Sequence, residues 1–311
     1  MKTNLSINSL FLSLLLFNAM YAFTPEHAHG PSNWSNAWSA YHQNNAQQAP
    51  ANPKQQTYGQ LECNLEAITE TLQRDSHIHI PGPEITDTTT RRTTKTTIES
   101  SSNWSGYACT GANNSVSMVA GSWAVPTIVK SSPANTTYCA FWVGIDGFSS
   151  STVEQIGTAH DWSSGKMQSY AWFEMYPGGS YSINGFPLKI GDAISAEVLY
   201  SGNGVFTMTL YNDTEKVYTS IPTSYTTLKT AQRNSAEWIV EAPYYNGILP
   251  LSNFGTGHLS SCTATINGVT NTIGSFSNIA LQMITNNGAY KAYTAALTSN
   301  NASFSVTWDH Q

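Results

Sequence analysis

The sequence predicts an all-β protein in which two antiparallel sheets form one β-sandwich, preceded by a leader of different composition. Three observations indicate this fold class. Short runs of alternating apolar residues recur between residues 103 and 311, turn signals containing Gly or Asn separate them, and no pattern of helical period there exceeds a turn or two. Strands at this spacing over about two hundred residues are typical of a single antiparallel sandwich.

The expected strands are short and have the alternation of a sheet with one buried face. Turns at Asn184-Gly, Ser201-Gly-Asn-Gly and Asn287-Gly separate several of them. The runs that predict strands are residues 121–125, 141–145, 152–156, 170–176, 193–200, 205–211, 236–242, 278–285 and 303–308.

The first 22 residues have the composition of a secretory signal peptide. Lys2 precedes an apolar run, Leu10–Phe17, and the small residues Ala19 and Ala22 follow it. The run is shorter than the roughly 20 residues that a membrane-spanning helix needs, which disfavours an uncleaved anchor. We therefore expect a secreted protein, extracellular or periplasmic, with no membrane attachment after the signal is removed.

Residues 23–102 form a leader rich in Gln, Asn, Pro and Thr, a composition that buries too little apolar surface to fold by itself. One exception is residues 61–74, where apolar residues recur at helical spacing and predict a short amphipathic helix. These residues are Leu61, Leu65, Ile68 and Leu72. Two interpretations stay open. The leader is either a plain tether, or a pro-segment that inhibits the domain by covering a groove until acid releases it and it is cleaved.

Charge is sparse in the body of the chain. From residue 103 onward, seven Lys or Arg stand against eleven Asp or Glu, a net charge of −4 with histidine neutral. Such a composition suits a protein that works in acid, and it equally suits an ordinary secreted β-protein. No basic patch with interleaved aromatic residues occurs, so no nucleic-acid partner is expected. The motifs H-E-x-x-H and G-x-S-x-G are absent, and we expect a monomer without metal or cofactor.

Export permits disulfides, and the chain has four cysteines. Cys63 lies in the leader, whereas Cys109, Cys139 and Cys262 lie in the body. Connectivity cannot be derived from sequence. Our expectation is a bridge between Cys109 and Cys139, because both lie on early strands.

Polar residues alternate with aromatic residues on several of the expected strands. Because successive side chains point to opposite faces, Gln155 shares a face with Val153 and Glu154 lies on the other. Two further sets share a face: Trp172, Glu174 and Tyr176 on one strand, and Glu237, Ile239 and Glu241 on another. Polar groups among aromatic rings indicate a groove rather than a core.

Four segments in this order resemble the glutamic peptidase (eqolisin) family of secreted acid endopeptidases. They are WVGIDG from Trp142, VEQIG from Val153, AWFEMYP from Ala171 and AEWIVE from Ala236. The resemblance runs from about residue 103 to the C-terminus, roughly two thirds of the chain. It implies polypeptide substrates and a concanavalin A-like, jelly-roll-like sandwich with a cleft on its concave face.

The resemblance also selects the site residues, which spacing alone would not do. By the family pattern, Gln155 is the catalytic glutamine and Glu237 the catalytic glutamate, with Glu241 as the other candidate on the same face. Supporting or substrate-binding roles are implied for Trp142, Asp146, Trp172, Glu174 and Tyr176.

A glutamate and a glutamine suffice for peptide hydrolysis in acid. One carboxyl serves first as base for the attacking water and then as acid for the leaving amine, if its pKa lies near the working pH. An amide N–H aimed at the oxyanion in a dry cleft contributes roughly 100- to 1000-fold in rate. Glu174, between aromatic rings, is expected to have a raised pKa and is a further candidate acid. Such an enzyme is expected to be insensitive to pepstatin.

One position departs from the family pattern. Many members have an aspartate four residues after the glutamine, where this chain has Ala159, and the nearest acidic residue is Asp161. Either the loop here is longer, or a contact that supports the site is lost.

Two other functions fit a secreted sandwich. A glycoside hydrolase would use Glu174 and Glu237 as paired carboxylates about 5 Å apart or wider. It lacks support from an E-x-D-x-x-E signature and needs a carboxylate where Gln155 stands. A non-catalytic lectin-like module would also have an export signal and a low-complexity leader, but it would not need both Gln155 and Glu237. The sequence therefore favours a peptidase.

Overall fold

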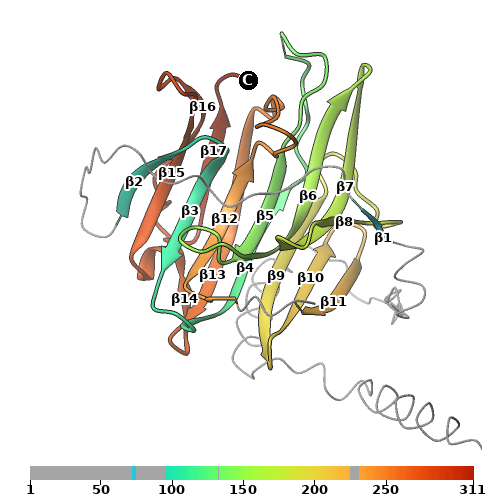
Figure 1. Cartoon of the computed structure of the whole chain (residues 1–311). Helices are drawn as coiled ribbons and strands as arrows, with labels where there is room; N and C mark the ends of the chain where they lie inside the picture. The colour runs from blue at the N-terminus through green and yellow to red at the C-terminus, as the bar shows by residue number, and fades with distance from the viewer. Residues whose placement is uncertain (1–71, 75–95, 132, 225–230) are drawn as a thin grey trace, which may run out of the picture. The chain divides into compact units, whose positions relative to one another are not determined.

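Two antiparallel sheets make up the described part of the protein, as predicted (Figure 1). The computed structural model describes residues 72–74, 96–131, 133–224 and 231–311. Within these residues the only helix is one 3₁₀ turn, η4 (Ile273–Ser275). The expected signal peptide and most of the leader lie outside the described residues. Across those ranges no helix has the length and apolar character needed to cross a membrane.

The first sheet carries the sequence motifs singled out above. Its strand order is β8, β7, β6, β5, β12, β3 and β15, with β1 added beyond β8 and β2 beyond β15. All of these pairs are antiparallel except that of β15 and β2. The strands are β1 (Leu72–Arg74), β2 (Thr96–Ser101), β3 (Trp104–Thr110), β5 (Ala140–Ile145), β6 (Val153–Ser163), β7 (Lys166–Tyr176), β8 (Ser180–Ile183), β12 (Ser235–Glu241) and β15 (Asn278–Ile284).

The second sheet runs in the order β11, β10, β9, β4, β13, β17 and β16, and β14 pairs with the far end of β13. A short pairing of β15 with β16 joins the two sheets at one edge. These strands are β4 (Val116–Ala124), β9 (Ala193–Gly202), β10 (Val205–Asn212), β11 (Val217–Ser224), β13 (Thr256–Ile266), β14 (Val269–Thr272), β16 (Tyr290–Thr294) and β17 (Phe304–Trp308).

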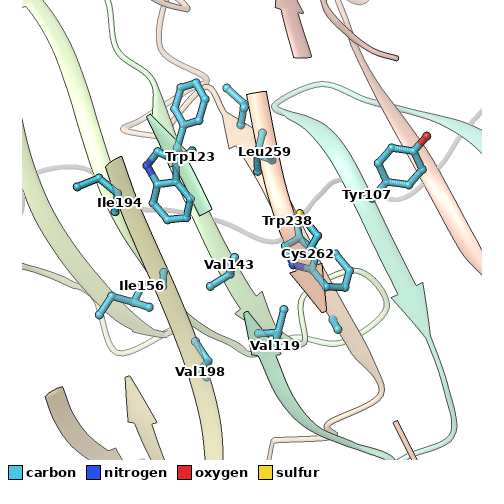
Figure 2. Close-up of a cluster of buried hydrophobic side chains, with 14 of the residues drawn as sticks. Tyr107, Val119, Trp123, Val143, Ile156, Ile194, Val198, Trp238, Leu259 and Cys262 are labelled. Atoms are coloured by element: carbon cyan, nitrogen blue, oxygen red, sulfur yellow. The ribbon is translucent and has the colours of Figure 1, made fainter. Parts of the chain in front are cut away.

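The core fills the space between the sheets. Figure 2 shows side chains of the first sheet, such as Val143 and Trp238, beside Val119 and Leu259 of the second. Two tryptophan N–H groups also hydrogen-bond between the sheets. Trp238 Nε1 donates to the Ala120 carbonyl at 2.8 Å, and Trp123 Nε1 donates to Thr158 Oγ1 at 2.9 Å. Core side chains such as Val143 and Trp238 occupy one face of the first sheet. Because side chains alternate along a strand, the residues next to them in sequence point to the other face.

The expected disulfide is wrong. Cys109, Cys139 and Cys262 are free and buried, so Cys109 and Cys139 are not bridged. The register explains this: Cys109 lies opposite Ala236, whereas the neighbour of Cys139 lies opposite Glu241, five residues further along β12. That is about 17 Å along the strand, well beyond the roughly 7 Å that a disulfide spans.

Only the last three residues of the predicted helix lie among the described residues, and they form a strand. Leu72–Arg74 is a strand, β1, that pairs with the edge strand β8, and residues 61–71 lie outside the described residues. An isolated amphipathic pattern this short is weak evidence for helix, because an exposed sheet edge offers the same backbone groups an alternative set of hydrogen-bond partners. The first sheet also takes in β2, six residues that lie ahead of the expected domain start at residue 103.

His160 on β6 is a neutral histidine in the core. Its Nε2 lies 2.9 Å from Thr158 Oγ1, its Nδ1 lies 2.9 Å from Ser169 Oγ, and its ring meets the ring of Phe141 edge-on. Burial lowers the pKa of His160 to about 3. The folded protein therefore resists protonation of a group that the unfolded chain protonates near pH 6.5.

We predict that His160 weakens the fold as the pH falls from 6.5 toward 3. Below pH 6.5 the unfolded state binds a proton that the folded state does not, so stability declines by about 1.4 kcal/mol per pH unit, or about 3 kcal/mol by pH 4. Urea denaturation of wild type and His160→Gln at pH 7 and pH 4 measures this. The variant should lose less stability between the two pH values, whereas the exposed control His258→Gln should lose as much as wild type. Equal losses in wild type and His160→Gln would contradict the account.

Candidate active site

One register row of the first sheet brings the two predicted catalytic residues together. Reading across neighbouring strands, Glu174, Gln155, Gly144, Glu237 and Ala108 lie directly opposite one another. All of these side chains lie on the face that points away from the core. Gln155 and Glu237 are thus two strand spacings apart, about 10 Å between backbones, with only a glycine between them.

Gly144 leaves room for the ring of Trp142. A Cβ at this position would stand 2.8 Å from Cζ3 of Trp142 and 3.2 Å from Cβ of Gln155. The first distance is shorter than real Cβ contacts, so an alanine here would displace the ring or the strand. The tryptophan ring therefore lies over β5 between the amide and the carboxyl and lines the bottom of the candidate site.

Gln155 is fixed by its neighbour on β7. Its Nε2 donates a hydrogen bond to Oε2 of Glu174 at 3.0 Å, and both side chains are fully buried. A flip of the amide group would exchange its nitrogen and its oxygen. Because the Glu174 carboxylate can only accept a hydrogen bond, it keeps the amide nitrogen on the side of β7. Glu174 thus orients the amide.

Glu237 is a fully buried carboxyl with a raised pKa. Neither of its oxygens has a hydrogen-bond partner of acceptable geometry among the described residues, and the side chain is fully buried. Burial is the largest cause that raises its pKa well above the ordinary value, and the carboxyls of Asp146 and Glu154 raise it further. The Ser235 hydroxyl and the Phe148 main-chain N–H act in the opposite direction. They lie near the carboxyl without forming a well-aligned hydrogen bond.

Glu241 lies on the same face as Glu237 but binds Trp142. Its Oε2 accepts a hydrogen bond from Trp142 Nε1 at 2.8 Å, and its Oε1 accepts one from Asn103 Nδ2 at 3.3 Å. The ring of Trp104 packs edge-on against Trp142, with 5.0 Å between centroids. Glu241 is therefore placed to hold the tryptophan that lies over Gly144.

Asp146 fixes the start of β12. It follows β5 with φ +70° and is fully buried. Its carboxylate accepts hydrogen bonds from the main-chain N–H of Arg233 at 2.7 Å and of Asn234 at 2.9 Å. Its own N–H donates to the carbonyl of Ser235 at 3.0 Å. Burial raises the pKa of Asp146, and hydrogen bonds from Asn234, Arg233, Gln232 and Thr152 offset part of that rise. Asp146 thus ties the end of β5 to the strand that carries Glu237.

The structure places the remaining predicted residues on the same face. Trp172 and Tyr176 flank Glu174 on β7, and Trp172 packs with Trp104 and Trp142 in one apolar cluster. Strand β6 is continuous through Ala159, which lies between Ala140 and Tyr170, so no longer loop replaces the missing aspartate. The residues that sequence reasoning missed are Asn103, Trp104, Gly144, Phe148 and Ser235. Only the pairing of distant strands could have identified them.

Comparisons with known proteins settle the family. The model of the Peptidase A4 family matches residues 102–308. The chain belongs to this family. It is therefore a peptide hydrolase of the glutamic type, and its sandwich is the eqolisin fold.

Solved structures agree. Scytalido-glutamic peptidase with a transition-state analogue inhibitor is 25% identical, covers 67% of this chain and 98% of its own, and has a TM-score of 0.58. SCP-B, an eqolisin in complex with the tripeptide Ala-Ile-His, is 22% identical over 67% of this chain and 98% of its own, with a TM-score of 0.54. Aspergilloglutamic peptidase from Aspergillus niger is 24% identical over 56% of this chain and 99% of its own, with a TM-score of 0.51. No curated protein sequence matches the chain.

Metal ligands are not gathered anywhere in the ranges that the structure describes. No group of three or more His, Cys, Asp or Glu side chains there could hold a metal ion. The candidate site offers carboxyls, one amide and indoles, groups that can transfer protons and form hydrogen bonds.

We predict that Asp146→Asn destabilises the peptidase and reduces its activity. An amide nitrogen would face a main-chain N–H in place of an acceptor, which costs about 1–3 kcal/mol for a buried group. Thermal unfolding monitored by circular dichroism measures the first effect, and peptide cleavage below the melting range measures the second. Ser150→Ala, in the same loop but half-buried, serves as control and should change the melting temperature less. Unchanged stability of Asp146→Asn would show that the anchor contributes nothing.

Proposed function

We propose that this peptidase is a secreted acid endopeptidase that hydrolyses peptide bonds with Gln155 and Glu237. The observation that carries the proposal is the register row in which these two residues face each other over Gly144. An amide on one side and a carboxyl on the other can act on a carbonyl between them. The orienting contact from Glu174 and the raised pKa of Glu237 support the same assignment.

The proposed reaction needs one carboxyl in two states. Ionised Glu237 accepts a proton from water, and the water oxygen bonds to the scissile carbonyl carbon. One N–H of Gln155 stays on Glu174 while the other donates to the oxyanion that forms. Protonated Glu237 then gives its proton to the amide nitrogen, the C–N bond breaks, and the carboxylate is restored. The raised pKa makes the Glu237 carboxylate a stronger base in the first step, and it ties activity to the pH range in which Glu237 is ionised.

The other site residues support the dyad in this proposal. Glu241 orients Trp142, and Asp146 anchors β12, so neither touches the reacting atoms. Trp172 and Tyr176 extend an apolar wall along β7 for substrate side chains. A paired-carboxylate mechanism is not favoured, because Glu174 and Glu237 are three strand spacings apart, about 14 Å between backbones, with Gln155 and Gly144 between them.

We also propose that the leader acts as a pro-segment that restrains the enzyme. Support comes from β1, which adds a strand to β8, the neighbour of the strand that carries Glu174 and Trp172. Leader residues thus pair with the edge of the sheet that bears the candidate site. We further propose that the N-terminal signal sequence directs export and that the mature enzyme is a monomer.

Substitutions of the dyad test the function. Gln155→Ala and Glu237→Gln should each lower kcat/KM on unfolded casein or a peptide substrate at least 100-fold between pH 2 and pH 7, with pepstatin present throughout. Glu241→Gln is the matched control, because it changes a glutamate on the same strand and face. Its kcat/KM should fall less than that of Glu237→Gln. We expect the loss to appear as a higher KM, because Trp142 would be displaced. Full activity of both Gln155→Ala and Glu237→Gln would contradict the proposed dyad. An inactive Glu241→Gln beside an active Glu237→Gln would show that Glu241 is the catalytic glutamate.

Cleavage of the leader should activate the enzyme. We expect the full-length chain after signal removal to cleave peptides slowly, and to gain activity at least tenfold once the leader is cut, because β1 no longer occupies the edge of β8. Incubation at acidic pH followed by electrophoresis and peptide assays measures both events. Equal activity of the uncut and cut proteins would show that the leader is a tether.

A further inference from the structure

Two buried polar side chains stand side by side next to the candidate site without partners. Ser235 and Glu237 are two residues apart on β12, so their side chains lie on the same face of the sheet. Both residues are fully buried. The Ser235 hydroxyl and both Glu237 oxygens have no hydrogen-bond partner among the described residues. A buried hydroxyl without a partner costs about 1–3 kcal/mol, so it calls for an explanation.

The surroundings of Glu237 oppose its ionisation. Its burial is the largest cause, and Asp146 and Glu154 place negative charge near it. Among the residues that the structure describes, two neighbours favour the charged form, the Ser235 hydroxyl and the Phe148 main-chain N–H, and Ser235 has the larger effect of the two. A base that must be ionised to activate water therefore has one side-chain donor within reach.

We propose that Ser235 is a positioning residue of the peptidase that donates its hydroxyl hydrogen to the Glu237 carboxylate when that group acts as base. The inference rests on the proposed role of Glu237 and extends it to Ser235, which precedes the segment AEWIVE. Asp146 holds Ser235 in place, since the Asp146 N–H binds the Ser235 carbonyl and the Asp146 carboxylate binds the two preceding N–H groups.

The contact has a direct consequence for the working pH. A hydrogen bond to the carboxylate favours the ionised form and lowers its pKa, and its loss raises the pKa by about one unit. The kcat/KM of an enzyme that needs ionised Glu237 rises with pH through that pKa. Removal of the hydroxyl should therefore move this acidic limb of the pH profile to higher pH, and it should leave the plateau nearly unchanged.

Ser235→Ala tests the proposal in the leader-free enzyme. We expect the acidic limb of kcat/KM to move up by about one pH unit, which is about tenfold lower activity on that limb, with a plateau within twofold of wild type. Ser235→Thr keeps the hydroxyl and should restore the wild-type limb. Ser235→Cys keeps the size with a weaker donor and should give an intermediate limb, which serves if the alanine variant folds poorly. Ser122→Ala, a buried hydroxyl on β4 of the second sheet, is the control and should not move the limb.

The outcomes separate the two proposals. If Glu237→Gln is inactive but Ser235→Ala and Ser235→Cys keep the wild-type limb, Ser235 does not position the base and only the present inference fails. If Glu237→Gln is active, the proposed dyad fails first. A carbon-13 titration of Glu237 in labelled wild type and Ser235→Ala provides a readout independent of turnover. It should show the higher pKa in the variant, and equal values would overturn the proposal.

Discussion

The site depends on the register of β5 between β6 and β12. That ladder places Gly144 between Gln155 and Glu237, and it turns both side chains to the face that points away from the core. A slip of one residue in either pairing would move a site residue to the core face and a core residue to the site. The cross-sheet contacts of Trp238 and Trp123 oppose such a slip, because their N–H groups find partners in only one register.

The buried polar groups of the candidate site differ in their hydrogen bonds. Asp146 is satisfied by main-chain donors and anchors β12, and Glu241 accepts two side-chain N–H groups. Glu237, on the same face, has no well-formed hydrogen bond among the described residues. Such a carboxyl costs stability and gains a raised pKa, a combination expected of a proton-transfer group rather than of a structural one.

Much of this was predictable from the sequence, and the rest depended on contacts between distant strands. Alternation gave the faces of Gln155, Glu174 and Glu237 correctly, because side-chain parity is a local property of a strand. It could not show that Gly144 lies between Gln155 and Glu237, since that follows from pairing with residues 11 and 93 positions away in the sequence. The Cys109–Cys139 bridge failed for the same reason. At Leu72–Arg74, the end of the expected helix, the chain instead pairs with the sheet edge at β8, a partner that a local pattern cannot reveal.

The proposed dyad can be tested by a crystal structure of the leader-free peptidase bound to a peptide in which a phosphinic group replaces the scissile amide. We expect one phosphinic oxygen within hydrogen-bond distance of Gln155 Nε2 and the other beside the Glu237 carboxyl, both above Gly144 and the ring of Trp142. A phosphinic group bound elsewhere on the sheet, or contacted by neither residue, would contradict it.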